Sequence, residues 1–336
     1  FNISWNIFIF HLINNNYIMK NSYSNIYTFN EKILNKLINS LKNGGVAGLP
    51  TETVYGLGGN AYLKKSVQKI FELKGRPKNN PLIIHYHDLN DAKNDIEINN
   101  YLVNLYRKFC PGPITFILNR KMKSKIHPSA CGKLNTVAVR FPKHRVVRTL
   151  LKKIEFPLAM PSANKSSGVS PVSPKDVFEE FKEKLKLIIN GGSCKIGIES
   201  TVIDLTSTPQ ILRPGIIDKV LIEKTLKLKV LYNFKNKKIM SPGMIKKHYS
   251  PGIPVSINQK KHDGKSAFIY LGYKHKYKNS FFSLSKKSNL KEAATNLYRL
   301  FRLIKRKGFK KIQICKIPNT GPGIAINDRI RRASKF

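Results

Sequence analysis

The sequence predicts an α/β protein made of two domains. Short apolar runs that suit buried strands alternate with amphipathic helical patterns, as in mixed sheets flanked by helices. The chain has 336 residues, enough for two domains, and 41% of them are hydrophobic, so a sizeable core is expected. A segment rich in Pro and Gly separates a long first pattern from a short second one. The expected divisions are an extension (1–27), a first domain (28–231), a linker (232–260) and a second domain (261–336).

The first domain opens with a helix and a strand. In 30–43 the apolar residues recur on one helical face, Asn30 can cap the start, and Gly44 stands where a C-terminal cap glycine belongs. The strand 46–49 then leads into a loop at 51–59, and a second helix at about 63–74 ends at Gly75. Lys74 and Arg76 therefore flank a helix C-terminus, where cations often only complement the helix dipole.

Further strands and one helix start complete the first domain. Ser173 and Pro174 give a capped helix start with an acid, Asp176, at the third position. The other β-rich runs are 114–118, 135–140, 158–160, 187–190 and 202–205. In the second domain we expect a strand at 266–271, a long helix at 290–306, a strand at 311–316, a turn at 321–323 and a last helix near 326–333.

The composition favours a cytoplasmic protein that attracts anions. The formal net charge is +42, which draws polyanions such as RNA. Because the Lys residues are spread along the whole chain, the charge also fits a surface that is merely rich in Lys. The four Cys are isolated, which disfavours a zinc site or disulfides, and no apolar run approaches the roughly 20 residues that span a bilayer. Residues 1–18 look foreign, and we expect translation to start at Met19.

Two nucleotide-binding motifs are only partly matched, and we reject both. Gly56 to Ala61 resembles a dinucleotide fingerprint, but Pro50 interrupts the preceding strand and no ribose-binding acid follows at the right distance. Gly264-Lys265-Ser266 resembles the end of a P-loop, but Gln259 stands where its first Gly belongs.

The polar residues at the predicted strand ends are mostly hydrogen-bond donors. A cleft rich in donors recognises carboxylates and phosphates and stabilises charge on a phosphoryl group, so phosphoryl or nucleotidyl transfer needs no covalent nucleophile. The His residues are scattered and form no Ser–His–Asp pattern, and only 19 residues are acidic. The donor set comprises Thr53, Lys74, Arg76, Asn80, Thr136, Arg140, Ser162, Asn164, Ser170, Ser200 and Arg213.

Several motifs, in order, resemble a known family. The runs PTETVYGLG (50–58), KGRP…NPL (74–82), PGPIT (111–115), VRFP (139–142) and PSAN (161–164) resemble the YrdC-like domain. With ESTVID (199–204) and RPG (213–215) the chain resembles the threonylcarbamoyl-AMP synthases. SPGM (241–244), HYSP (248–251) and AINDRIRRA (325–333) resemble their long, two-domain form. The resemblance implies a YrdC-like twisted mixed sheet with flanking helices, a linker that acts as a lid, and a small Rossmann-like C-terminal α/β domain.

The resemblance also implies a reaction and roles for site residues. L-threonine, bicarbonate or CO2, and ATP would give L-threonylcarbamoyl-adenylate and pyrophosphate, for the threonylcarbamoyladenosine modification at position 37 of tRNA. Lys74 and Arg76 would be catalytic and face the phosphates. The residues implied for L-threonine are Thr53, His85, Arg140, Met160 and Ser200. Those implied for ATP are Arg76, Asn80, Thr136, Ser162, Asn164, Ser170, Arg213 and Tyr249.

The implied cofactor is Mg²⁺, which arrives with ATP and is held largely by phosphate oxygens, with no protein metal site and no tightly bound organic cofactor. The expected partners are ATP, L-threonine, bicarbonate, the downstream tRNA threonylcarbamoyl-transferase proteins and, weakly, RNA on the basic surface, with no membrane. Two alternatives stay open: a non-catalytic module of this fold that binds double-stranded RNA, and a carbamoyl transferase of hydrogenase maturation. The chain lacks the zinc-finger cysteines of the latter family.

Overall fold

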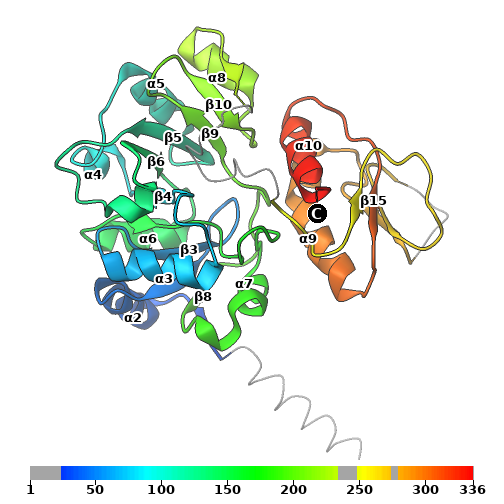
Figure 1. The fold of residues 1–336 in the computed structure, drawn as a ribbon, viewed down its shortest axis with the longest axis horizontal. Helices are drawn as coiled ribbons and strands as arrows, with labels where there is room; N and C mark the ends of the chain where they lie inside the picture. Colours follow the sequence, from blue (N-terminus) through cyan, green and yellow to red (C-terminus); the bar gives the residue numbers. More distant parts are fainter. Residues whose placement is uncertain (1–23, 234–247, 274–278, 336) are drawn as a thin grey trace, which may run out of the picture.

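The computed structural model describes residues 24–233, 248–273 and 279–335. Within these ranges an eleven-stranded sheet is followed along the chain by a four-stranded sheet, each with its own helices (Figure 1). Most of the expected extension (1–27) and the SPGM motif lie outside the described residues. The large sheet begins at Ile26 and includes a last short strand at Leu231–Tyr232. Among the described residues we find no helix that is both long and apolar enough to cross a membrane.

The large sheet is mixed and runs in the order β1-β8-β2-β3-β7-β4-β6-β5-β9-β10-β11. Its strands in chain order are β1 (Ile26–Thr28), β2 (Val46–Leu49), β3 (Gly56–Asn60), β4 (Ile83–His85), β5 (Ile114–Asn119), β6 (Thr136–Arg140), β7 (Leu158–Ala159), β8 (Ile188–Asn190), β9 (Thr201–Asp204), β10 (Gln210–Arg213) and β11 (Leu231–Tyr232). Its helices are α2 (Glu31–Lys42), α3 (Lys64–Lys74), α4 (Leu89–Ala92), α5 (Asn100–Phe109), α6 (Arg145–Lys153), α7 (Pro174–Phe181) and α8 (Lys219–Leu226), with 3₁₀ turns at Pro128–Cys131 and Lys182–Lys184.

The capped helices form where the sequence predicts them. The Asn30 side chain accepts a hydrogen bond from the Ile33 N–H, and α2 buries Leu34, Leu37 and Leu41. Helix α3 ends at Gly75, whose left-handed φ of 56° costs little only without a Cβ. Helix α7 has the expected capping box between Ser173 and Asp176.

The glycine run after Tyr55 is a strand and not part of a loop. The expected loop at 51–59 is wrong in its second half, because Gly56–Asn60 pairs antiparallel with β2 as β3. The glycines are needed for packing: a Cβ on Gly56 would lie 2.3 Å from Cγ of Met160, and one on Gly58 would lie 2.6 Å from Cδ1 of Leu49. The backbone N–H groups of this run therefore serve the sheet, which agrees with the rejection of a dinucleotide fingerprint.

Four helices of the first domain, α4, α5, α6 and α8, are absent from the sequence prediction. Asn99 caps α5, while α6 follows Pro142 and is capped by His144, a residue outside the usual set of caps. The apolar face of α6 is present in the sequence at helical spacing, and its residues Val146, Val147, Leu150 and Leu151 pack under α2 and β2. In the second domain the last helix starts at Pro322 instead of Ile326, since proline is favourable in the first turn of a helix.

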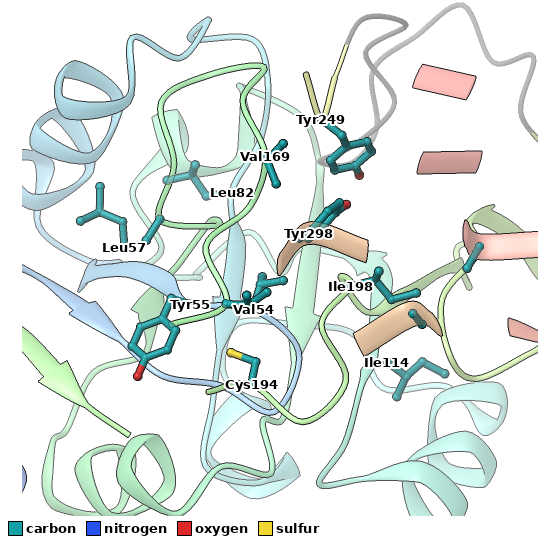
Figure 2. Close-up of a cluster of buried hydrophobic side chains, with 14 of the residues drawn as sticks. Val54, Tyr55, Leu57, Leu82, Ile114, Val169, Cys194, Ile198, Tyr249 and Tyr298 are labelled. Atoms are coloured by element: carbon teal, nitrogen blue, oxygen red, sulfur yellow. The ribbon is translucent and has the colours of Figure 1, made fainter. Parts of the chain in front are cut away.

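The small sheet has four parallel strands in the order β12-β15-β13-β14. They are β12 (Val255–Ser256), β13 (Ala267–Tyr270), β14 (Phe281–Ser283) and β15 (Ile312–Ile314), with helices α9 (Leu290–Arg306) and α10 (Pro322–Ala333). The two helices lie on the side of this sheet that faces the large domain (Figure 1). The largest hydrophobic cluster continues from one domain to the other, and Figure 2 shows Val54 and Ile198 near Tyr298 of α9.

One face of the large sheet positions the site. Helices α2 and α6 pack against Ala47, Leu49, Leu158 and Met160 on this face. Residues paired across neighbouring strands point to the same face of a sheet. His85 is paired with Leu158 and with Arg140, so both His85 and Arg140 lie on this face. Further along the same face a smaller apolar cluster consists of strand residues, namely Ile83, Ile117, Ala138, Val202 and Leu212.

Candidate active site

A small cavity lies where β4, β6 and β7 meet the loop between β2 and β3. Its volume of about 40 Å³ has room for a few water molecules but not for a nucleotide. In this conformation the space is therefore too small for a nucleotide, and larger ligands enter only if lining residues move. It is lined by Thr51, Val54, Gly56, Arg76, Ile83, His85, Arg140, Met160, Pro161, Ser162, Glu199, Arg213, His248 and Tyr249.

Hydroxyl groups shape the turn that leads from β2 to β3. The Thr51 hydroxyl donates to the Val54 carbonyl at 2.6 Å and accepts from the N–H groups of Thr53 and Val54. The Thr53 hydroxyl lies 2.8 Å from Oγ1 of Thr51, so it is the donor of that pair. Thr53 is fully buried and keeps its lone pairs as acceptors for a neighbouring donor.

Arg140 carries an internal carboxylate partner. Its Nη2 donates to Oε1 of Glu52 at 2.6 Å, and the other carboxylate oxygen accepts from the Lys143 N–H at 3.0 Å. Burial alone would raise the pKa of Glu52, but Arg140 outweighs it and the pKa is lowered. The Nε group of Arg140 is buried and has no hydrogen-bond partner. Glu52 thus fixes the guanidinium while one of its donors is left for a ligand.

Two further guanidinium groups reach the cavity, Arg76 from the loop after α3 and Arg213 from the end of β10. The Arg76 hydrogen bonds go to neutral oxygens, at Asn80 and at the Pro81 carbonyl. Arg213 donates through Nε to the Ser200 carbonyl and through Nη2 to Oγ of Ser200, both at 3.1 Å. Burial, followed by the charge of Arg213, lowers the pKa of Arg76 to about 9. Two cations held this close favour an anion between them.

Lys74 lies behind the cavity wall. Its ammonium group donates to the backbone carbonyls of Ser162 and Asn164, at 2.5 Å each. Burial, and then the charge of Arg76, lowers its pKa well below the usual range. The PSAN turn therefore holds Lys74 through backbone oxygens and brings the ammonium next to Ser162, which lines the cavity.

Two histidines at the cavity are held neutral. Burial lowers the pKa of His85 to about 3, helped by Arg140, and burial lowers the pKa of His248 to about 3 as well. Next to His248, Tyr249 has a left-handed φ of 67° and a fully buried ring. The Nδ1 atom of His248 and the hydroxyl of Tyr249 have no hydrogen-bond partner. Unpartnered buried polar atoms are costly, so they indicate a place where a polar ligand binds.

The remaining residues of the predicted site stand one contact behind the lining. Asn80 bonds to Arg76, Ser200 to Arg213, and Ser170 donates to Oε1 of Glu199 at 2.6 Å. The Asn164 side chain donates to two backbone carbonyls and leaves a buried, unpartnered Oδ1. Thr136 is the first residue of β6, and it pairs with Asn119 of β5. It shares the face of Arg140, toward the other end of β6.

Both carboxylates at this site already accept hydrogen bonds from protein groups. Glu52 accepts from Arg140 and from the Lys143 N–H, and Glu199 accepts from buried donors. Burial raises the pKa of Glu199, but the nearby arginines outweigh it and hold the pKa at about 2. Neither carboxylate is free to build a metal cage. In the described part of the chain one group of acids and histidine could hold a metal, formed by His87, Asp88 and Asp91, and it does not line this cavity.

Sequence reasoning did not assign several residues that the fold brings to the site. These are Thr51, Glu52, Thr115, Glu199 and His248. Glu52 and Glu199 had one usable signal, since acids are scarce in this chain and both stand inside singled-out motifs. Thr115 also stands inside a singled-out motif, PGPIT (111–115), but its 2.7 Å contact with Oγ of Ser200 depends on the parallel pairing of β5 with β9, which the motif does not reveal.

Two family models cover most of the chain. The model for Sua5, YciO and YrdC, described as "Telomere recombination", matches residues 39–215. A second, described as "Threonylcarbamoyl-AMP synthase, C-terminal domain", matches residues 215–335. Their junction at residue 215 lies in the RPG motif, before α8 and β11 of the large domain.

Curated relatives and solved structures match at similar length. The chain is 36% identical to the threonylcarbamoyl-AMP synthase of Pyrococcus abyssi, with 88% of this chain and 92% of the relative covered. It is 33% identical to that of Bacillus subtilis, covering 88% and 90%. The crystal structure of P. abyssi Sua5 complexed with L-threonine superposes with a TM-score of 0.85 at 33% identity, covering 92% of this chain and 97% of that one.

Proposed function

Because this chain belongs to the Sua5/YciO/YrdC family, in its two-domain form, we propose that it is a threonylcarbamoyl-AMP synthase. It would convert L-threonine, bicarbonate or CO2, and ATP into L-threonylcarbamoyl-adenylate and pyrophosphate. The observation that carries the proposal is the pairing of two anion-binding features in one cavity. Arg140 offers an unpartnered Nε, while Arg76 and Arg213 form a separate cationic pair.

The threonine would bind at the Arg140 end of the cavity. Its carboxylate would accept from the unpartnered Nε of Arg140, whose plane Glu52 fixes. The acceptor oxygen of Thr53, neutral His85, the Met160 main chain and Ser200 would surround the amine and the hydroxyl. A neutral imidazole adds no charge that would repel the ammonium group, which supports this placement of His85.

The nucleotide would run from Arg213 along the sheet face toward Thr136. Its phosphates would meet Lys74, Arg76 and Arg213, and Tyr249 would cover it. The apolar floor of Ile83, Ile117 and Ala138 offers a surface for the base. The residues proposed to complete this part are Asn80, Thr136, Ser162, Asn164 and Ser170.

The chemistry would proceed in two steps. The threonine ammonium group first gives up a proton to water, and the free amine then attacks the carbon of CO2 and gives up a second proton to water, which leaves a carbamate. A carbamate oxygen then attacks the α-phosphorus of ATP, and the bond to the bridging oxygen of pyrophosphate breaks. The cations offset the charge that develops on the phosphoryl group.

Mg²⁺ would supply further charge neutralisation on the phosphates when it arrives with ATP. The occupied state of Glu52 and Glu199 supports a metal held by phosphate oxygens instead of a protein cage. We also propose a cytoplasmic location, product transfer to tRNA threonylcarbamoyl-transferase proteins, and weak RNA contact through the basic surface, which the net charge of +42 supports.

Pyrophosphate release tests the proposal. The purified chain should release pyrophosphate from ATP only when both threonine and bicarbonate are present, and mass spectrometry should identify the adenylate. Lys74→Met and Arg76→Met should lower the rate strongly. Arg148→Met is a matched control, because Arg148 bonds to His87 and does not line the cavity. Release without threonine, or no release at all, would overturn the proposal.

A further inference from the structure

The second domain reaches into the large domain at one buried carboxylate. Glu199 directly precedes Ser200, and its side chain is 8% exposed. Its oxygens accept from Ser170 of the large domain at 2.6 Å, from the hydroxyl of Tyr298 on α9 at 3.0 Å, and from Nε of Arg329 on α10 at 3.0 Å. Two of these three donor residues belong to the second domain.

Arg329 joins two segments that carry site residues. Its side chain is fully buried, and its Nη1 donates to the Pro214 carbonyl at 2.8 Å and to Asp328 at 2.9 Å. Pro214 directly follows Arg213, just as Glu199 directly precedes Ser200. One guanidinium group therefore fixes the backbone beside Arg213 and the carboxylate beside Ser200.

These two segments are packed too closely to move independently. Arg213 donates twice to Ser200, and a Cβ on Gly215 would lie 2.3 Å from the Thr201 nitrogen. A displacement of Glu199 or of Pro214 would consequently shift Ser200 and Arg213 together.

Tyr249 completes the arrangement. Its ring stacks on Tyr298 with centroids 5.8 Å apart and an interplanar angle of 26°, and the Arg329 guanidinium lies 5.3 Å from its centroid. Figure 2 shows Tyr249 next to Tyr298, above the α9 segment. The second domain thus supports a residue that lines the cavity as well as the carboxylate behind it.

We propose that Arg329 and Tyr298 are positioning residues for the synthase reaction, supplied by the second domain. They hold Glu199, Pro214 and Tyr249 so that Ser170 and Arg213 keep the geometry that binds ATP, while Ser200 keeps its place at the threonine end. This inference rests on the proposed function. Stability alone explains the arrangement poorly, since a buried ion pair often contributes little net stability compared with apolar residues.

Arg306 provides a matched control. It is an arginine of the same domain that pairs across the same interface, at 2.6 Å from Glu179, but its side chain is 39% exposed and does not contact Glu199. Arg306→Gln removes two interdomain ion pairs, to Glu179 and to buried Asp176 of the α7 capping box, without touching the site.

The test uses full-length variants and two readouts, ATP binding by calorimetry and steady-state pyrophosphate release. Arg329→Gln alone leaves the buried Glu199 charge unpaired and so risks misfolding. The double variant E199Q/R329Q removes both charges of this ion pair together, and its thermal midpoint should stay near that of the wild type. The KM of this double variant for ATP should rise about tenfold or more, because the loss of one well-oriented polar contact weakens binding by about that factor. Tyr298→Phe keeps the ring stack and should raise KM by about threefold, and R306Q should match the wild type.

The outcomes separate this inference from the proposed function. If the wild type is active and a folded E199Q/R329Q variant has wild-type constants, Arg329 is merely structural and the inference is wrong. An R306Q variant as impaired as the double variant would contradict it equally. If the wild type binds ATP without turning over, the synthase proposal fails, and the inference is then decided by ATP affinity alone. If the wild type neither binds ATP nor releases pyrophosphate, both the synthase proposal and the inference about Arg329 fail.

Discussion

The Arg140 side chain is held by Glu52, and its Nε has no hydrogen-bond partner, which makes its role testable. If its Nε receives the threonine carboxylate, Arg140→Ala should weaken threonine binding by about 10- to 100-fold, the worth of a charged hydrogen bond. ATP binding should change much less, because Arg76 and Arg213 remain. Calorimetry with each ligand, with Arg148→Ala as a surface control, would decide this. Equal losses for both ligands would contradict the assignment.

His85 and His248 predict how the protein responds to acid. Their pKa values of about 3 lie below the ordinary 6.5, so between these values the unfolded chain binds protons that the folded chain excludes. Their stabilising effect is thus intact above pH 6.5 and is lost as the pH falls, by about 2 kcal/mol per histidine at pH 5. Glu199, with a pKa of about 2, adds a loss only below about pH 4.5.

Thermal midpoints between pH 7.5 and 5.0 would measure this effect. We expect a steady fall, and a shallower one for His85→Gln, which cannot take up a proton when the chain unfolds. A midpoint that stays constant across this range would show that both imidazoles titrate near their ordinary value in the folded protein.

Strand β3 depends on having no side chain at Gly56. A Cβ there would lie 2.3 Å from Cγ of Met160, so Gly56→Ala should cost about 1–3 kcal/mol and push Met160 into the cavity. Met160 lines the proposed threonine end, and the KM for threonine should therefore rise.

A double-mutant cycle checks the cause of this cost. In a Met160→Ala background, where the crowded atoms are gone, Gly56→Ala should cost less than half as much stability. The measurement is the denaturant midpoint of the four proteins. Equal costs in both backgrounds would place the strain elsewhere in β3.

Among the elements, those with a local signal were predicted well. Helices α2 and α3 have their caps in the sequence, and α9 was placed at the observed bounds of 290–306. Strand β3 was not, because its signal is not local: a glycine-rich strand looks like a loop until its neighbours fill the space of the missing side chains. Helix α6 is an exception, since it does have a local signal, an apolar face at helical spacing, and yet was not predicted.

The two domains work as one unit in this arrangement. Removing residues 241–336 would take away Tyr249 together with Arg329 and Tyr298, and would leave Glu199 without two of its three donor residues. Pyrophosphate release should fall roughly 100-fold, as for two lost contacts of about 1.4 kcal/mol each. Circular dichroism of the shortened chain serves as the folding control. A shortened chain that is folded and fully active would rule out a part for the second domain in the reaction.

The sequence by itself determined the α/β class, the capped helices and the family, because these depend on local patterns and on motifs in fixed order. It also pointed to the residue types that gather at the cavity. Only the tertiary structure decided how they are connected: that Glu52 holds Arg140, that backbone carbonyls hold Lys74, and that Arg329 reaches Glu199 across 130 positions. Such contacts depend on strand register and on the packing of two domains, and side-chain patterns along the chain do not encode either in a readable form.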